Sequence, residues 1–163
     1  MKNVSRSDYL KSEYKKINNL FLSGKFDLVI EKSKKILKKN SSQIPFYNLM
    51  ALSYRETGKL YLAEEILNKA LKINSNDQSV LVNLGSTYRI LIEYEKSEKF
   101  LKKAIQLMPN DPIVNDHYGD VLWKLNRKIQ AKYYWRNAIN SKDAEEEIKK
   151  NNSKKLLKGL SEG

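Results

Sequence analysis

The sequence predicts an all-α protein, an α-solenoid of helix-turn-helix repeats that ends in a C-terminal capping helix. Residues of similar type recur every 34 positions over most of the chain. Within each period, apolar residues follow the spacing of two successive helices. Only 6 Gly and 3 Pro occur among 163 residues, a scarcity that suits long helices better than a turn-rich β-fold. A fixed period of this length is typical of a solenoid.

Small residues mark the period most clearly. They fall in three columns: Ala51, Gly85 and Gly119; Ala63, Ser97 and Ala131; Ala70, Ala104 and Ala138. A column of large apolar residues accompanies them: Leu67, Leu101 and Trp135. Two helices joined by a short turn cross closely, so we expect the small residues to leave room for the neighbouring helix.

The first part of the chain departs from this pattern. Residues 1–9 are predicted to be an N-terminal extension, and residues 10–43 a degenerate first repeat. Gly24 lies 34 residues before Gly58, but β-branched residues replace the small ones at Ile17, Val29 and Ile36. An end repeat contacts only one neighbour, which explains a weaker match.

Three clearer repeats follow, at 44–77, 78–111 and 112–142. In each, we expect a first helix, a short turn such as the one at Gly58, and a second helix. The polar stretch 74–77 breaks the chain and supplies caps for the next helix. Pro112 stands where a helix begins, because its missing N–H costs nothing there.

Residues 143–163 are predicted to form a capping helix and tail. Asp143 would cap this helix and Gly159 would end it. Its apolar side would consist of Ala144, Ile148, Leu156 and Leu157. The alternative is a frayed polar tail.

Composition excludes several classes of site. There is no Cys and a single His, which rules out disulfides, thiolate metal sites and a cysteine nucleophile. His117 beside Asp116 and Asp120 lacks a third strong ligand, so we expect no metal. No phosphate loop, nucleophile elbow or dinucleotide fingerprint occurs in the sequence, so we expect no cofactor and no enzymatic activity. No apolar run reaches the length of a membrane span, and the first residues lack the apolar core of a signal peptide. A cytoplasmic location is therefore the expectation.

The repeated columns resemble the tetratricopeptide repeat (TPR) family, and the stretch 115–139 is similar to the last repeat of many bacterial members. The resemblance implies a right-handed superhelix and a scaffold that binds other proteins. It further implies that the first helix of each repeat lines a concave groove. The groove residues would be Tyr14, Asn18, Phe21, Asn48, Leu52, Arg55, Val82, Ser86, Arg89, Asp116, Asp120 and Trp123.

The charges of these residues predict a polarised groove. Its positive side chains, Arg55 and Arg89, lie in the middle, and its negative ones, Asp116 and Asp120, lie at one end. Because Arg binds carboxylates in a bidentate manner, the predicted ligand is an extended or helical peptide with at least one acidic residue. The alternative is that these are ordinary solvated residues. The chain lacks the cations with which some family members clamp a C-terminal carboxylate.

Two other functions stay open. Some bacterial TPR arrays are fused to sulfotransferase or glycosyltransferase domains, so the chain could be a regulatory or targeting module of such a system. Its net charge of +12 suggests a nucleic-acid or membrane-surface binder. However, residues 1–43 carry +7 and residues 112–163 carry +4, while 44–77 are neutral. The Lys-rich run 31–39 has no interleaved aromatic residue, which disfavours base stacking. Oligomers are possible because solenoid ends can stack.

Overall fold

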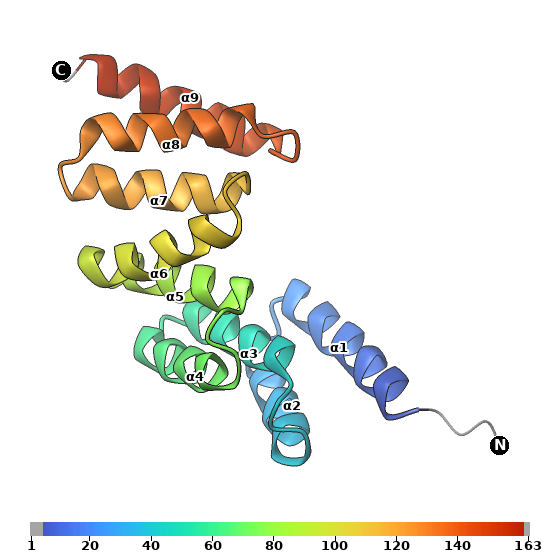
Figure 1. The fold of residues 1–163 in the computed structure, drawn as a ribbon. Helices are drawn as coiled ribbons and strands as arrows, with labels where there is room; N and C mark the ends of the chain where they lie inside the picture. Colours follow the sequence, from blue (N-terminus) through green and yellow to red (C-terminus); the bar gives the residue numbers. More distant parts are fainter. Residues whose placement is uncertain (1–4, 162–163) are drawn as a thin grey trace. The chain divides into compact units, whose positions relative to one another are not determined.

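The computed structural model describes residues 5–161, which form helices joined by short loops, with no strand in that range. The prediction of an all-α chain is confirmed (Figure 1). The helices in chain order are α1 (Arg6–Leu22), α2 (Phe26–Lys39), α3 (Ile44–Glu56), α4 (Leu60–Ile73), α5 (Gln78–Ile90), α6 (Tyr94–Leu107), α7 (Pro112–Lys124), α8 (Lys128–Asn140) and α9 (Glu146–Ser161). In the part described, no helix is both long and apolar enough to cross a bilayer.

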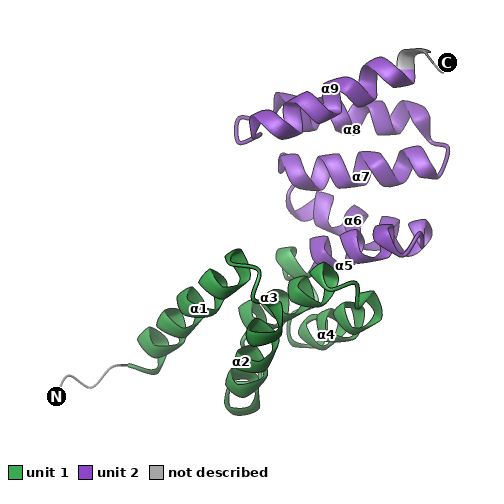
Figure 2. Cartoon of the chain, turned by 180° about the vertical axis from the view of Figure 1, so that it is seen from behind, with its two compact units in different colours: residues 1–80 green, residues 81–163 purple. Residues whose placement is uncertain are grey.

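The chain divides into two compact units, residues 1–80 and 81–163, with the boundary inside α5 (Figure 2). In unit 1, α3 packs against α2 and α4, and α1 contacts both α2 and α3. In unit 2, α7 packs against α6 and α8, and α9 contacts both α8 and α7. Each unit therefore contains helix pairs of the predicted kind.

The turn between paired helices is the same in every repeat. Four residues spaced by 34 adopt a left-handed backbone: Gly24 (φ 71°), Gly58 (φ 73°), Ile92 (φ 64°) and Asn126 (φ 61°). The amide N–H of each bonds to the carbonyl three residues earlier, as in Gly58 to Arg55 at 2.9 Å. Gly adopts this conformation at no steric cost, whereas a β-branched residue such as Ile92 is strained there.

The residues in the three columns of small side chains are packed as the sequence predicts. Ala51, Ala70 and Ala104 are fully buried. A Cβ added to Gly85 would lie 2.5 Å from Leu101 Cγ, and one added to Gly119 would lie 2.5 Å from Trp135 Cδ1. In these two repeats, the first helix is thus in direct contact with a large side chain of the second helix.

The predicted helix starts are also confirmed. Asp77 Oδ1 accepts a hydrogen bond from the Val80 N–H at 3.0 Å. Asp111 Oδ1 accepts one from the Val114 N–H at 2.9 Å, and Pro112 follows as the first residue of α7. At the other end of the chain, Ser5 caps α1, which already includes residues 6–9 of the expected extension.

The capping helix exists, but details of its prediction are wrong. Leu157 is 69% exposed rather than part of the buried side. Gly159 is buried inside α9, which continues to Ser161 instead of stopping there. Asp143 precedes α9 by three residues, so it does not cap the helix. The helix is rotated so that Asn152, Lys155 and Gly159, not Leu157, face α7 and α8.

Candidate functional site

The twelve predicted groove residues all lie on the first helices of the repeats. In unit 1, Tyr14, Asn18 and Phe21 are on α1, and Asn48, Leu52 and Arg55 are on α3. In unit 2, Val82, Ser86 and Arg89 are on α5, and Asp116, Asp120 and Trp123 are on α7. Ser86 is only 2% exposed and so presents little surface to a ligand. The other eleven keep some exposed surface.

Two aromatic residues of α1 take part in packing. The Tyr14 ring meets Phe46 of α3 edge-on, with ring centroids 5.9 Å apart. The Phe21 ring meets Phe26 at 5.4 Å. Because these contacts hold α1 against the rest of unit 1, both side chains have a structural role independent of any ligand.

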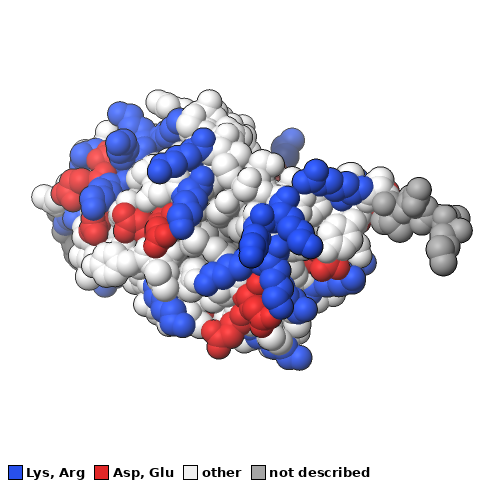
Figure 3. Space-filling view, turned by 90° about the horizontal axis from the view of Figure 1, so that it is seen from below, with Lys and Arg blue, Asp and Glu red and all other residues white. Residues whose placement is uncertain are grey.

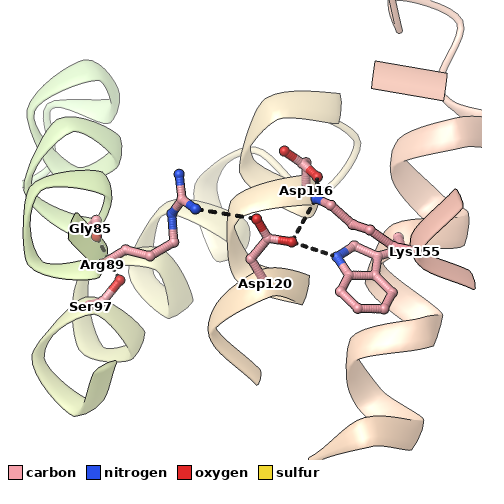
Figure 4. Close-up of polar contacts among 7 residues, drawn as sticks. Gly85, Arg89, Ser97, Asp116, Asp120 and Lys155 are labelled. Atoms are coloured by element: carbon pink, nitrogen blue, oxygen red, sulfur yellow. Dashed lines mark hydrogen bonds and ion pairs between the residues drawn. The ribbon is translucent and has the colours of Figure 1, made fainter. Parts of the chain in front are cut away.

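In unit 2, the predicted acidic end of the groove is already occupied by cations. Lys155 Nζ lies 2.5 Å from Asp116 Oδ1 and 2.6 Å from Asp120 Oδ1. Arg89 Nη1 lies 3.3 Å from Asp120 Oδ2. Figure 4 shows these side chains converging from α5, α7 and α9. A hydrogen bond from Trp135 Nε1 to Asp120 Oδ1, at 3.1 Å, adds a fourth helix to the cluster.

These ion pairs are partly shielded from water. The side chains of Asp116 and Asp120 are 20% and 21% exposed, and that of Lys155 is 29% exposed. Charge-assisted hydrogen bonds in such surroundings are stronger than pairs on an open surface. The prediction of an acidic end to the groove is therefore corrected, because cations of the chain itself neutralise Asp116 and Asp120.

Sequence reasoning missed Lys155. It lies 35 residues from Asp120 and 39 from Asp116, on a helix that does not belong to the repeat. No column of the repeat pointed to it. The available signal was the cluster of lysines in α9, which the apolar pattern assigned to the solvent side.

Two tryptophans lie beside the ion pairs. The rings of Trp123 and Trp135 are 5.2 Å apart between centroids, with an interplanar angle of 36°. Lys128 Nζ lies 5.3 Å from the Trp123 centroid, and Lys155 Nζ lies 5.6 Å from that of Trp135. Gly159 of α9 packs on Trp123, since an added Cβ would come within 3.0 Å of its ring.

These groups surround a pocket of about 330 Å³ in unit 2. Its lining residues are Arg89, Tyr94, Asp120, Trp123, Lys124, Trp135, Lys155, Lys158 and Gly159. Three of them were predicted, and the remainder come from the second helices α6 and α8, the last residue of α7, and α9. Four cationic side chains face one carboxylate, and the aromatic rings offer apolar area. The pocket is suited to bind an anionic group attached to an apolar one.

A second polar cluster joins α6 to the residue that precedes α8. Glu98 of α6 accepts two hydrogen bonds from the Arg127 guanidinium, one of them from Nη2 at 3.0 Å. Burial raises the pKa of Tyr118 to about 12, and the nearby Glu98 carboxylate contributes to the rise. Tyr118 therefore stays neutral at ordinary pH and acts in packing rather than as a base.

On one face of the molecule, side chains of both signs lie near one another (Figure 3). Figure 3 shows Lys and Arg side chains interspersed with Asp and Glu on the face in view. Within the Lys-rich run of α2, Lys35 Nζ pairs with Glu31 at 2.6 Å. Among the residues described, no group of three or more His, Asp or Glu side chains is placed to hold a metal ion.

Comparison with known proteins identifies the repeat. The tetratricopeptide repeat family model matches residues 44–77 and 78–111. Residues 44–111 are therefore two tetratricopeptide repeats. Comparison with curated proteins gives no match.

Solved TPR structures share this fold. A thermophilic TPR protein of Thermus thermophilus superposes with a TM-score of 0.78 at 18% identity, covering 89% of this chain and 80% of that one. MamA of Desulfovibrio magneticus RS-1 gives 0.74 at 12% identity, covering 93% and 91%. The translocator chaperone SycD of Yersinia enterocolitica type III secretion gives 0.68 at 14% identity, covering 73% and 92%. At these identities the likeness extends to the fold.

Proposed function

We propose that this TPR protein is a non-enzymatic interaction scaffold that binds a peptide segment of a partner protein. The TPR fold supports this, because it presents a row of similar helices whose exposed side chains vary from repeat to repeat. Among proteins with this fold, SycD is described as a chaperone. The pocket of unit 2 contains no Cys or His that could serve as a nucleophile or base.

The unit 2 pocket carries the proposal. Asp120, the one carboxylate in its lining, is already bonded to Arg89, Lys155 and Trp135. The lining holds four cationic side chains and this one carboxylate, so its net charge is positive and the partner segment is proposed to be acidic. Trp123 and Trp135 supply the anchoring area that interaction hot spots commonly use.

Unit 1 is proposed to contribute a second contact. Arg55 lies one repeat before Arg89 in the same column and is partly exposed. Asn48 and Leu52 flank it on α3, giving polar and apolar contacts beside the cation. A segment that uses both arginines would carry acidic residues at more than one place.

The test uses the full chain with Arg55 and Arg89 both changed to Ala. A partner isolated by affinity purification with the wild-type chain should bind the double variant at least about tenfold more weakly, since each charged hydrogen bond contributes about 1.5–3 kcal/mol. The matched control is Lys69→Ala, which removes a cation that pairs with Glu65 on the same helix, α4. Equal affinity of the wild-type chain and the double variant, at unchanged helicity, would reject the site.

The two alternative functions make different predictions. If the chain serves a sulfotransferase- or glycosyltransferase-type system, the purified partner will be such an enzyme and should still depend on Arg89. If it binds nucleic acid or a membrane surface, the exposed lysines of α2 are the observation in its favour. Retention of RNA in a filter-binding assay at physiological salt, unaffected by the Arg55 and Arg89 changes, would support that function instead.

A further inference from the structure

Asp116 and Asp120 lie one turn apart on α7, and one ammonium group bridges them. We propose that these carboxylates and the Trp135 ring form a lysine-recognition site, which the chain fills with its own Lys155. Lys155 thereby determines which charge the unit 2 pocket accepts. The preference for an acidic segment rests on the proposed function, whereas the lysine site stands on its own geometry.

The surroundings of Lys155 are those that a lysine from another protein would need. Its Nζ atom contacts both carboxylates at 2.5 and 2.6 Å and lies 5.6 Å from the centroid of Trp135. The Trp135 N–H holds Asp120 in place from the other side. Two carboxylates and an aromatic face together bind an alkylammonium through charge and through the ring quadrupole.

Lys155 links α9 to α7 through polar contacts, whereas Asn152 makes none to another helix among the residues described. Asn152 is fully buried, and its amide N–H₂ donates only within its own helix, to the Ile148 carbonyl at 3.0 Å. Asn152 Oδ1 is buried without a hydrogen-bond partner among the described residues, which opposes docking. Leu157 stays exposed. The double ion pair of Lys155 is therefore a specific polar contact between α9 and α7, alongside the packing of Gly159 on Trp123.

The net charge that the pocket presents to a ligand depends on the pairing of Lys155 with Asp116 and Asp120. With Lys155 in place, both α7 carboxylates are neutralised and the remaining cations dominate the lining. Without its charge, Asp120 in the lining and Asp116 one turn away lose the ammonium group that bridges them, while Asp120 keeps its bonds to Arg89 and Trp135. A buried charge that loses its partner is strongly unfavourable, so the site would then favour a cation.

The experiment compares Lys155→Gln with Lys149→Gln in the full chain. Lys149 is a suitable control because it is on the same helix, loses the same charge, and pairs with Glu146 of α9 at 3.0 Å rather than with α7. The probes are capped alanine-based peptides of matched sequence that carry either glutamate or lysine. Tryptophan fluorescence reports on this site, because the 2 Trp of the sequence both line the pocket.

We expect Lys155→Gln to bind the lysine probe at least about tenfold more tightly than the wild-type chain or Lys149→Gln, equivalent to about 1.4 kcal/mol. Its affinity for the glutamate probe should fall. Adding Asp116→Asn and Asp120→Asn to Lys155→Gln should abolish the gain, whether or not α9 remains docked. Circular dichroism checks that all variants are folded.

No gain for the lysine probe in Lys155→Gln would overturn the inference, as would a gain that survives in the triple variant. Failure of the wild-type chain to bind the glutamate probe would instead count against the acidic ligand of the proposed function. The two proposals can therefore fail separately.

Discussion

The α3–α4 hairpin of unit 1 and the α7–α8 hairpin of unit 2 are built on the same frame. Their first helices begin at Ile44 and Pro112, and their second helices at Leu60 and Lys128, in both cases two periods of 34 apart. Each turn contains one left-handed residue, Gly58 or Asn126. The difference between the hairpins therefore lies in their side chains.

The first difference is in volume. Ala51 opposite Leu67 in unit 1 corresponds to Gly119 opposite Trp135 in unit 2, and all four are buried. A larger side chain on the second helix is accompanied by a smaller one on the first. In these two hairpins we therefore expect the two positions to be coupled in packing.

The second difference is in chemistry. Asn48, Leu52 and Arg55 on α3 correspond to Asp116, Asp120 and Trp123 on α7. In unit 2 a further helix, α9, supplies Lys155 to the two carboxylates. The repeat keeps the positions at which side chains are presented, while the chemistry of those side chains differs from one repeat to another.

The largest expected effect tests the volume pair. Gly119→Ala should lower the free energy of unfolding by about 1–3 kcal/mol, since its Cβ would come within 2.5 Å of Trp135 Cδ1. The double variant Gly119→Ala, Trp135→Leu recreates the Ala51–Leu67 pair and should lose less than the sum of the single variants. Urea unfolding measures both. Additive effects would show that the two positions are not coupled.

A smaller expected effect is the loss of stability at high pH. It concerns Tyr118 and is absent at Met50, the residue two periods earlier, because methionine does not titrate. In the folded state the pKa of Tyr118 is about 12, above the value of 10.0 for an exposed tyrosine. The stability linked to this group is complete below pH 10 and is lost as the pH rises toward 12, because only the unfolded state releases the proton. The loss should be about 1–2 kcal/mol. Tyr118→Phe should remove it from the pH dependence of urea unfolding, and identical curves would contradict the prediction.

The smallest effect concerns the turns. Ile92 is 70% exposed and has φ 64°, whereas Gly58 has φ 73° at the equivalent position. Ile92→Gly should raise the free energy of unfolding by about 0.5–1 kcal/mol, because relief of the left-handed strain exceeds the added freedom of the unfolded chain. Gly58→Ile should act in the opposite direction. Thermal melting checks both, and a lower melting temperature for Ile92→Gly would refute this account of the turn.

Much of the fold follows from local rules that operate within one repeat. The apolar spacing predicts α3 to α8, Gly24 and Gly58 predict the turns, and Asp77 with Pro112 predicts helix starts. Helix α9 was harder to orient because it lies outside the period. Its apolar residues suggested a face that included Leu157, while contacts with distant residues turned Lys155 and Gly159 inward.

The sequence by itself determined the helical repeat, its period and the helix faces on which Arg89, Asp120 and Trp123 lie. These are consequences of periodicity and capping, which act over a few residues. Only the tertiary structure decided that Asp116 and Asp120 are neutralised rather than presented to a ligand. That outcome depends on a cation more than thirty residues away along the chain, and Coulomb interactions depend on distance in space, not on separation in sequence.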